Sequence, residues 1–249
     1  MHKLTIHTSL KLAAALSLCL LLSAPVLQAQ RRHGSQQQRI NAYLTTGATF
    51  SQIEGDELKG FDKCGFTGGV GALTSLSSDN LFWLSVETDF SQRGAYNNTG
   101  DPYSLRDFTL NYVDIPLMFH FVDPYGGLMM GLGLDYSRLV QQPHGEIRYS
   151  PSYFVPDTSN MAFLRNDVAL VGDVRFTIWE HLKLNVRMQY SLIPIKKGWN
   201  FTEYHHADVP TQWANNCYNS SISVRLIWLF GDQPKPRLVN RKHSPSHRR

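Results

Sequence analysis

The chain has 249 residues, of which 42% are hydrophobic and 18% are charged, and its formal net charge at pH 7 is +4. The excess of positive charge lies at the two ends. Between residues 30 and 231, 16 Lys and Arg face 19 Asp and Glu, so the body is mildly acidic. This distribution argues against nucleic-acid binding, which needs a basic surface on the folded body. The length indicates one domain.

Residues 1–29 have the features of a signal peptide. Lys3 and Lys11 give a positive start, residues 12–22 an apolar centre, and residues 27–29 a cleavage motif. The apolar centre is too short to cross a membrane as an ordinary helix. Residues 30–38 are expected to be an N-terminal periplasmic segment, and beyond them the longest strictly apolar run is 226–230. A mature chain of this kind can cross a membrane only as a closed β-barrel.

Eight strands are expected from the alternation of apolar and polar residues. They lie at residues 39–50, 64–74, 81–93, 108–121, 126–140, 165–179, 182–194 and 217–230. The seventh alternates without an error: Leu184, Val186 and Met188 are apolar and the residues between them are polar. Because side chains of a strand alternate between its two faces, one face would meet lipid and the other a polar lumen. The second strand is Gly-rich, which suits a curved wall.

The connections alternate in length along the chain. Those at residues 75–80, 122–125 and 180–181 are short, and those at 51–63, 94–107, 141–164 and 195–216 are long. Outer-membrane barrels have short periplasmic turns, long external loops and an even number of strands. Residues 39–230 are therefore expected to form an all-β, eight-stranded antiparallel up-and-down transmembrane β-barrel in the cell outer membrane. A soluble β-barrel is the alternative.

The expected lumen carries charges of both signs. By the alternation, the inward positions include Glu87, Asp89, Asp114, Asp135, Asp173, Arg175, Lys183, Arg187 and Arg225. An eight-stranded barrel is just wide enough for side chains to fill, so these residues are expected to interlock as a polar network that plugs the lumen. The alternative is a path for protons or ions, since ionisable groups at membrane depth are often functional.

No catalytic, cofactor or metal site is expected. His120 and Asp114 would share the inward face, but we find no Ser in a recognisable motif near His120, which favours a structural histidine and a chain that is not an enzyme. His205, His206 and Asp208 in the last long loop could hold a metal. Adjacent histidines of a strand point apart and no third histidine follows at ligand spacing, which favours a solvated loop.

Cys64 and Cys217 are the two cysteines of the mature chain, and the compartment is oxidising. They would begin the second and eighth strands, with only the first strand between them, about 10 Å apart at the usual strand spacing. That separation exceeds the Cα–Cα reach of a disulfide, about 7 Å. Bending of the loops could close the gap, so a disulfide and two free thiols both remain open.

Residues 231–249 form a basic tail that is expected to be disordered on its own. Its six basic residues are Lys235, Arg237, Arg241, Lys242, Arg248 and Arg249. They could attract an acidic partner in the periplasm, or the tail could be a solvated extension.

Two motifs carry a resemblance to a known family. SVETDFSQRG at residues 85–94 and LNYVDIPL at residues 110–117 resemble the PorT-like outer-membrane β-barrel family of Bacteroidetes, in which a strand ending in (Y/F)SQ(K/R)G precedes one that reads LNY(L/V)(E/D)IPL. With GGLMMGLGL at 126–134 and the closing strand, the resemblance spans residues 39–230. It implies an outer-membrane barrel, and the founding member belongs to the type IX secretion system. Such chains usually stop at the final aromatic, whereas this one continues for 19 residues beyond Phe230.

Three functions are compatible with these features. The favoured one is a non-enzymatic accessory or scaffold in envelope assembly or secretion, type IX secretion included. Its expected partners are outer-membrane lipid and proteins bound at the loops and the periplasmic tail. The alternatives are a narrow channel or small-solute transporter, against which the mixed-sign lumen argues, and a lipid-acting barrel enzyme, against which the missing catalytic set argues.

Overall fold

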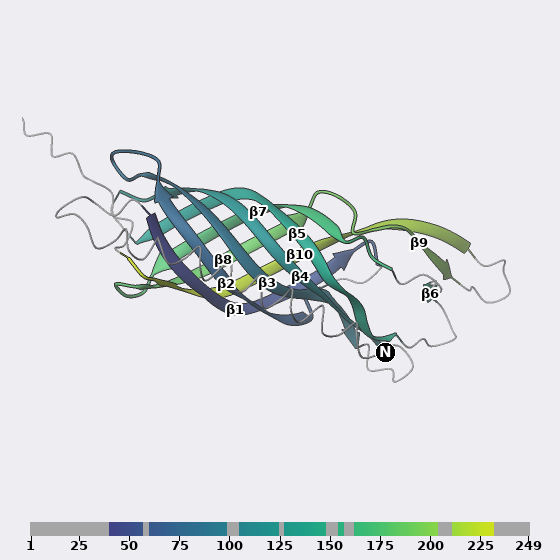
Figure 1. Ribbon diagram of the computed structural model, residues 1–249. Coiled ribbons are helices and arrows are strands. Elements are labelled where there is room, and N and C mark those ends of the chain that lie inside the picture. Colours follow the sequence, from purple (N-terminus) through teal and green to yellow (C-terminus); the bar gives the residue numbers. More distant parts are fainter. Residues whose placement is uncertain are drawn as a thin grey trace, which may run out of the picture. The chain divides into compact units, whose positions relative to one another are not determined.

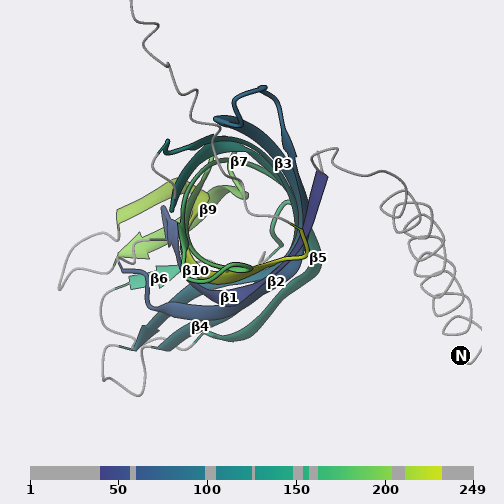
Figure 2. The ribbon, with the colours of Figure 1, turned by 90° about the vertical axis from the view of Figure 1, so that its left-hand side faces the viewer.

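Eight long strands close into an antiparallel barrel, as the alternation predicted. The computed structural model describes residues 40–56, 60–98, 105–124, 127–147, 154–156, 162–203 and 211–231. The wall consists of β1 (Ile40–Glu54), β2 (Lys63–Ser75), β3 (Phe82–Asn98), β4 (Leu105–Val122), β5 (Leu128–Ile147), β7 (Asn166–Thr177), β8 (Leu182–Ser191) and β10 (Thr211–Leu229). Each pairs with its neighbours, and β1 pairs with β10 to complete the ring (Figures 1 and 2). The predicted fold class is confirmed.

The end of the barrel with the short turns β2–β3, β4–β5 and β7–β8 is here called the periplasmic end, following the usual orientation of such barrels. The opposite end, called external, has strands that run further than predicted. β3 continues to Asn98, β4 starts at Leu105 and β5 extends to Ile147. The predicted loop at 94–107 therefore contains strand. Beyond the bilayer nothing imposes an apolar face, so the alternation that marks the barrel strands fades there.

Two further strands lie within the predicted external loops. β9 (Lys196–Glu203) pairs with the first part of β10, and the short β6 (Phe154–Pro156) pairs with β9. Both lie beyond one end of the barrel in Figure 1. The sequence analysis did not predict them, because neither has an alternating apolar face.

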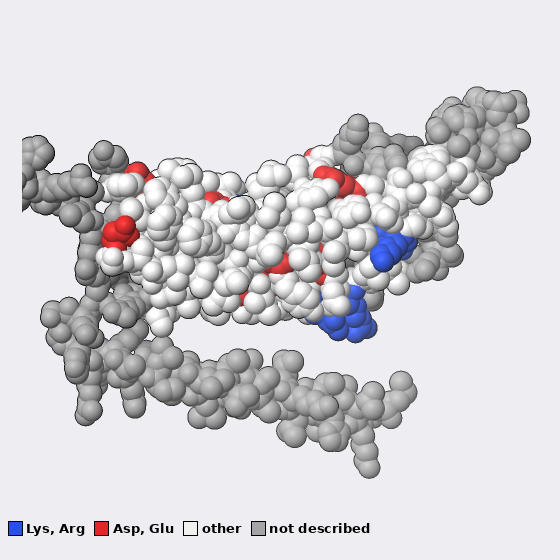
Figure 3. Space-filling view, turned by 90° about the horizontal axis from the view of Figure 1, so that it is seen from above, with Lys and Arg blue, Asp and Glu red and all other residues white. Residues whose placement is uncertain are grey.

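The outer wall is apolar where the alternation predicted a lipid-facing surface. On β8, Val186 and Met188 are 38% and 54% exposed, whereas the intervening Arg187 is 4% exposed and lies inside the barrel. In Figure 3 the visible wall is predominantly uncharged, and its Lys and Arg gather toward the end that carries β9. No helix among the described residues is long and apolar enough to cross a membrane.

Aromatic side chains surround the periplasmic end of the wall. The ring of Phe82 stacks on that of Phe119, with centroids 5.5 Å apart, and lies 5.7 Å from that of Phe121. Trp179 and Trp228 are exposed nearby, on β7–β8 and β10. Such aromatics anchor a barrel at the membrane–water interface.

The β2–β3 turn is stabilised by its own side chains. Asn80 adopts a left-handed backbone conformation, with φ of 58°, which Asn tolerates better than most residues. Asp79 accepts hydrogen bonds from the Ser77 hydroxyl and the Leu81 N–H, and these two bonds lower the pKa of its carboxyl. The indole N–H of Trp83 donates to the Asn80 carbonyl at 2.8 Å, which ties the turn to the first inward residue of β3.

Arginine placed at Val186 should destabilise the barrel by about 2–4 kcal/mol, because a charged side chain would face hydrocarbon near the middle of β8. The measurement is a denaturant titration of folding into phospholipid vesicles. Val186→Leu is the matched control and should cost less than about 1.5 kcal/mol. A harmless arginine at 186, together with failed folding when Lys183 and Gln189 are changed to Leu, would mean that the two faces of β8 are interchanged.

Candidate functional site

The middle of the lumen holds a group of paired charges, called here the central ion cluster. Its members come from four strands and are Glu87, Asp89, Asp173, Arg175, Arg187 and Arg225. Glu87 is the hub: one of its oxygens, Oε1, lies 2.8 Å from Arg175 and 2.9 Å from Arg187, and Oε2 lies 3.1 Å from Arg225. Three acids face three arginines, so the cluster is balanced in charge.

The remaining acids of the central ion cluster complete this pairing. Asp173 Oδ2 lies 3.1 Å from both Arg175 and Arg187, and Asp89 Oδ2 lies 2.9 Å from Arg225. The Tyr43 hydroxyl donates to Glu87 at 2.8 Å. None of these charged side chains is more than 5% exposed. Burial costs each ion several kcal/mol, which only close pairing of this kind offsets.

Closer to the external end lies a second group, called here the outer acid cluster. It contains Asp114, Asp135 and Asp167 around one cation, Arg93. The guanidinium nitrogens of Arg93 lie 2.6, 3.7 and 3.9 Å from the three carboxylates, in that order. Neutral donors supplement this one cation.

These neutral donors are two amides and two hydroxyls. Gln189 Nε2 donates to Asp135, and Asn219 Nδ2 donates to Asp167 at 3.1 Å. Ser137 donates to Asp135 at 2.8 Å, and Ser191 donates to Asp167 at 2.6 Å. One oxygen each of Asp114, Asp135 and Asp167 has no hydrogen-bond partner. Asp173 Oδ1 in the central ion cluster also lacks a hydrogen-bond partner. What distinguishes the outer acid cluster is therefore its excess of negative charge.

Apolar side chains close the lumen at both ends. The external apolar cluster consists of Ile53, Ala95, Phe108, Leu110, Tyr112, Leu139, Phe163, Ile195, Trp199 and Cys217. The periplasmic apolar cluster consists of Tyr43, Leu73, Trp83, Val122, Met129, Ile227 and Leu229. In the external cluster the rings of Phe108, Phe163 and Trp199 lie 5.8–6.4 Å apart. From the external to the periplasmic end, the buried interior therefore consists of the external apolar cluster, the outer acid cluster, the central ion cluster and the periplasmic apolar cluster.

A serine, a histidine and an aspartate meet between the central ion cluster and the periplasmic apolar cluster. Ser85 Oγ lies 2.7 Å from His120 Nε2, and His120 Nδ1 lies 3.5 Å from Asp173 Oδ1. No Ser lies in a recognisable motif near His120 in the sequence, because Ser85 reaches it from the neighbouring strand β3. A Ser–His–Asp set is catalytic only where substrate reaches the serine. Ser85 is 1% exposed and its cross-strand neighbour Leu73 belongs to the periplasmic apolar cluster.

The structure buries all nine residues that the alternation assigned to the lumen, each at 5% exposure or less. Eight of them lie in the two charged clusters. Lys183 instead donates to the Thr177 hydroxyl at 3.0 Å. The predicted set omitted Arg93 and Asp167, although Arg93 has the same parity as Glu87 and Asp89 on β3. Extending that parity to the end of the strand would have found it.

The two cysteines are free thiols in the structure, which contradicts the disulfide alternative. Cys64 is exposed and Cys217 is fully buried, so their side chains lie on opposite sides of the wall. They are also offset along the strands. Cys64 is level with Phe50 on β1, and Phe50 in turn is level with Ile222 on β10, five residues beyond Cys217.

Several predictions fall outside the described residues. These are the signal peptide and the segment at 1–38, the histidines His205 and His206 with Asp208, and the basic tail from Asp232 onward. Among the residues that are described, no three His, Cys, Asp or Glu side chains are arranged to hold a metal ion.

The chain belongs to the family described as the outer membrane protein beta-barrel domain, whose profile matches residues 14–228. Its location is accordingly the outer membrane. Two solved structures are similar. Neisserial surface protein A is 16% identical with a TM-score of 0.42, covering 75% of this chain and 96% of its own. The attachment invasion locus protein Ail of Yersinia pestis is 10% identical with a TM-score of 0.40, covering 78% and 100%. No curated protein matches the sequence.

The contrast between the two charged clusters predicts opposite responses to removal of one negative charge. Asp173→Asn should destabilise the barrel by about 3–5 kcal/mol, because it leaves Arg175 and Arg187 short of a buried partner. Asp135→Asn should cost clearly less, or stabilise, because it relieves repulsion among three carboxylates that share Arg93. Both are measured by denaturant titration in vesicles at neutral pH. Equal losses in the two variants would contradict the difference in charge balance.

Proposed function

We propose that this protein is a non-enzymatic, non-conducting outer-membrane scaffold that serves envelope assembly or secretion through its external loops and its periplasmic tail. The observation that supports the proposal is the closed interior. Paired charges fill the middle, and an apolar cluster lies at each end. With the lumen filled, binding is left to the outer surfaces of the barrel.

A role in type IX secretion rests on the resemblance to PorT-like barrels. The two motifs behind that resemblance lie on adjacent strands, where Phe90 pairs with Val113 and Ser91 with Tyr112. Their charged residues Glu87, Asp89, Arg93 and Asp114 all point into the lumen. The motifs therefore encode the interior of a barrel, which supports a shared family more than a shared partner.

The external end offers the larger surface for recognition. The extensions of β3, β4 and β5 and the pair β9–β10 continue beyond the barrel (Figure 1). Packing of the external apolar cluster, in which the aromatic rings meet in tilted and edge-on contacts, joins these segments, with Lys196 placed 5.4 Å from the rings of both Phe163 and Trp199. Loops on such a rigid base can vary in sequence without disturbing the barrel, which suits them to partner recognition.

A lipid-acting enzyme is the second candidate, and the Ser85–His120–Asp173 arrangement is what favours it. The 2.7 Å contact between Ser85 and His120 resembles a nucleophile with its base. Against it, the Asp173 carboxylate is occupied by Arg175 and Arg187 through its other oxygen. The serine also faces the lumen and not the lipid, so the scaffold remains the better supported function.

Purified protein in planar lipid bilayers should show no stable large conductance, because side chains fill an eight-stranded barrel. The control is a porin of known conductance in the same bilayer. Stable porin-like steps from the pure protein would favour the channel.

Deletion of residues 234–249 should leave barrel folding intact, seen as heat-modifiable migration in gels, while weakening co-purification of partner proteins from outer membranes. Glu87→Gln is the matched comparison. It should lower barrel stability by about 3–5 kcal/mol, because three arginines lose a buried partner, without changing partner binding per folded molecule. A tail deletion that affects no partner would make the tail a solvated extension. If a lumen variant folds stably but no longer co-purifies with partner proteins, the lumen is the functional site.

A further inference from the structure

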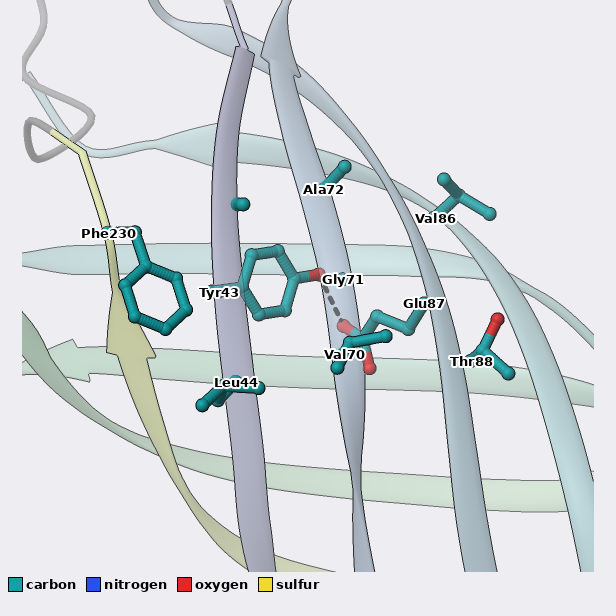
Figure 4. Close-up of a pocket in the computed structure, with 10 residues that line it drawn as sticks. Tyr43, Leu44, Val70, Gly71, Ala72, Val86, Glu87, Thr88 and Phe230 are labelled. Carbon is teal, nitrogen blue, oxygen red and sulfur yellow. Dashed lines mark hydrogen bonds between the residues drawn. The ribbon is translucent and has the colours of Figure 1, made fainter. Parts of the chain in front are cut away.

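The outer wall has a hollow near the periplasmic end, over β1, β2, β3 and the end of β10 (Figure 4). Its volume is about 390 Å³, and its lining includes Ala42, Leu44, Val70, Ala72, Val86 and Phe230. All of these except the two alanines are large apolar residues that are exposed on the wall. The volume falls within the roughly 300–1,000 Å³ of small-molecule sites.

The strand register explains why the wall is hollow at this point. Ala42 pairs with Ala72, which in turn pairs with Val86, and the Phe230 N–H donates to the Ala42 carbonyl at 2.9 Å. One row across four strands therefore reads large, small, small, large. At the usual strand spacing, Phe230 and Val86 stand on strands roughly 14 Å apart. Leu44 and Val70, paired in the next row, close the hollow on its external side.

The base of the hollow is thin. Gly71 has no side chain, and the Tyr43 ring lies directly behind it, so that a Cβ on Gly71 would collide with the ring. Figure 4 shows the Tyr43 hydroxyl directed at Glu87, away from the hollow. The Tyr43 hydroxyl is thus satisfied within the lumen, and the hollow presents mainly hydrocarbon to its occupant, with the Thr88 hydroxyl as a polar group at its edge.

We propose that this groove holds one acyl chain of a diacyl phospholipid from the periplasmic leaflet. The groove continues the wall that faces the membrane, and Phe230 is the last wall residue before the periplasm, beside the exposed Trp228. In a bilayer the available occupant is an acyl chain. A flexible hydrocarbon chain recovers the dispersion contacts that the two alanines leave unmade.

The proposal is tested with the full mature protein in phospholipid vesicles that contain a phosphatidylcholine with a diazirine on one acyl chain. After photolysis, mass spectrometry of the peptides locates the label. The expected result is preferential labelling of the peptides that contain Leu44, Val70 and Val86, compared with Leu132 and Leu134 on β5, which are equally exposed.

The variant Ala42→Leu/Ala72→Leu fills the groove and should abolish that preference. Ala48→Leu is the matched control: Ala48 lies on the same strand β1, with the same parity and outside the groove, and its variant should be labelled like wild type. If the double variant lacks heat-modifiable migration, Ala72→Leu alone is used. Label spread evenly over the wall, or unchanged in a folded groove-filling variant, would overturn the proposal.

Discussion

The structure depends on one constraint: charged side chains inside a barrel whose wall faces hydrocarbon must be paired within the barrel. Glu87 satisfies this constraint for much of the lumen, since Arg175, Arg187 and Arg225 all contact it. These arginines come from β7, β8 and β10, whereas Glu87 is on β3. The ion pairs therefore join strands that are not neighbours in the wall. They fix the interior across its width, where backbone hydrogen bonds act only between adjacent strands.

Room for these charges is made by glycines on the wall. A Cβ on Gly69 would collide with the Asp89 carboxylate, and one on Gly71 would collide with the Tyr43 ring. The Gly-rich strand β2, read in the sequence as a sign of curvature, thus also makes space for lumen side chains. Small side chains also produce the groove on the outer wall, because the row that includes Ala42 and Ala72 lies beside Gly71. Packing inside the barrel and shape outside it are therefore set by neighbouring small residues of β1 and β2.

The sequence predicts the structure best where the membrane imposes a pattern on the side chains. Within the bilayer each strand needs an apolar outer face and a buried inner one, so the period of two located all eight wall strands and the inward parity of residues such as Arg187 and Arg225. At the ends of the strands this demand ceases. Trp83, Ile227 and Leu229 are inward yet apolar, and β9 has no alternating face. Side-chain contacts between strands could not be predicted, for a different reason. The contact between Ser85 and His120 depends on the register of β3 and β4, which alternation alone does not fix.

The filled lumen decides how the remaining features of the molecule are interpreted. A Ser–His–Asp arrangement on a loop would indicate chemistry, but here Ser85 and His120 are held among the same side chains that close the periplasmic end. Their contact lowers the cost of burying Ser85 Oγ and His120 Nε2, which satisfy each other, whereas His120 Nδ1 has no hydrogen-bond partner. The charges of the outer acid cluster are not balanced: three carboxylates surround Arg93, and each has one oxygen without a hydrogen-bond partner. Natural barrels can keep such an imbalance when the stabilisation from the rest of the interior exceeds it. The central ion cluster differs in having matched charges, with three acids against three arginines.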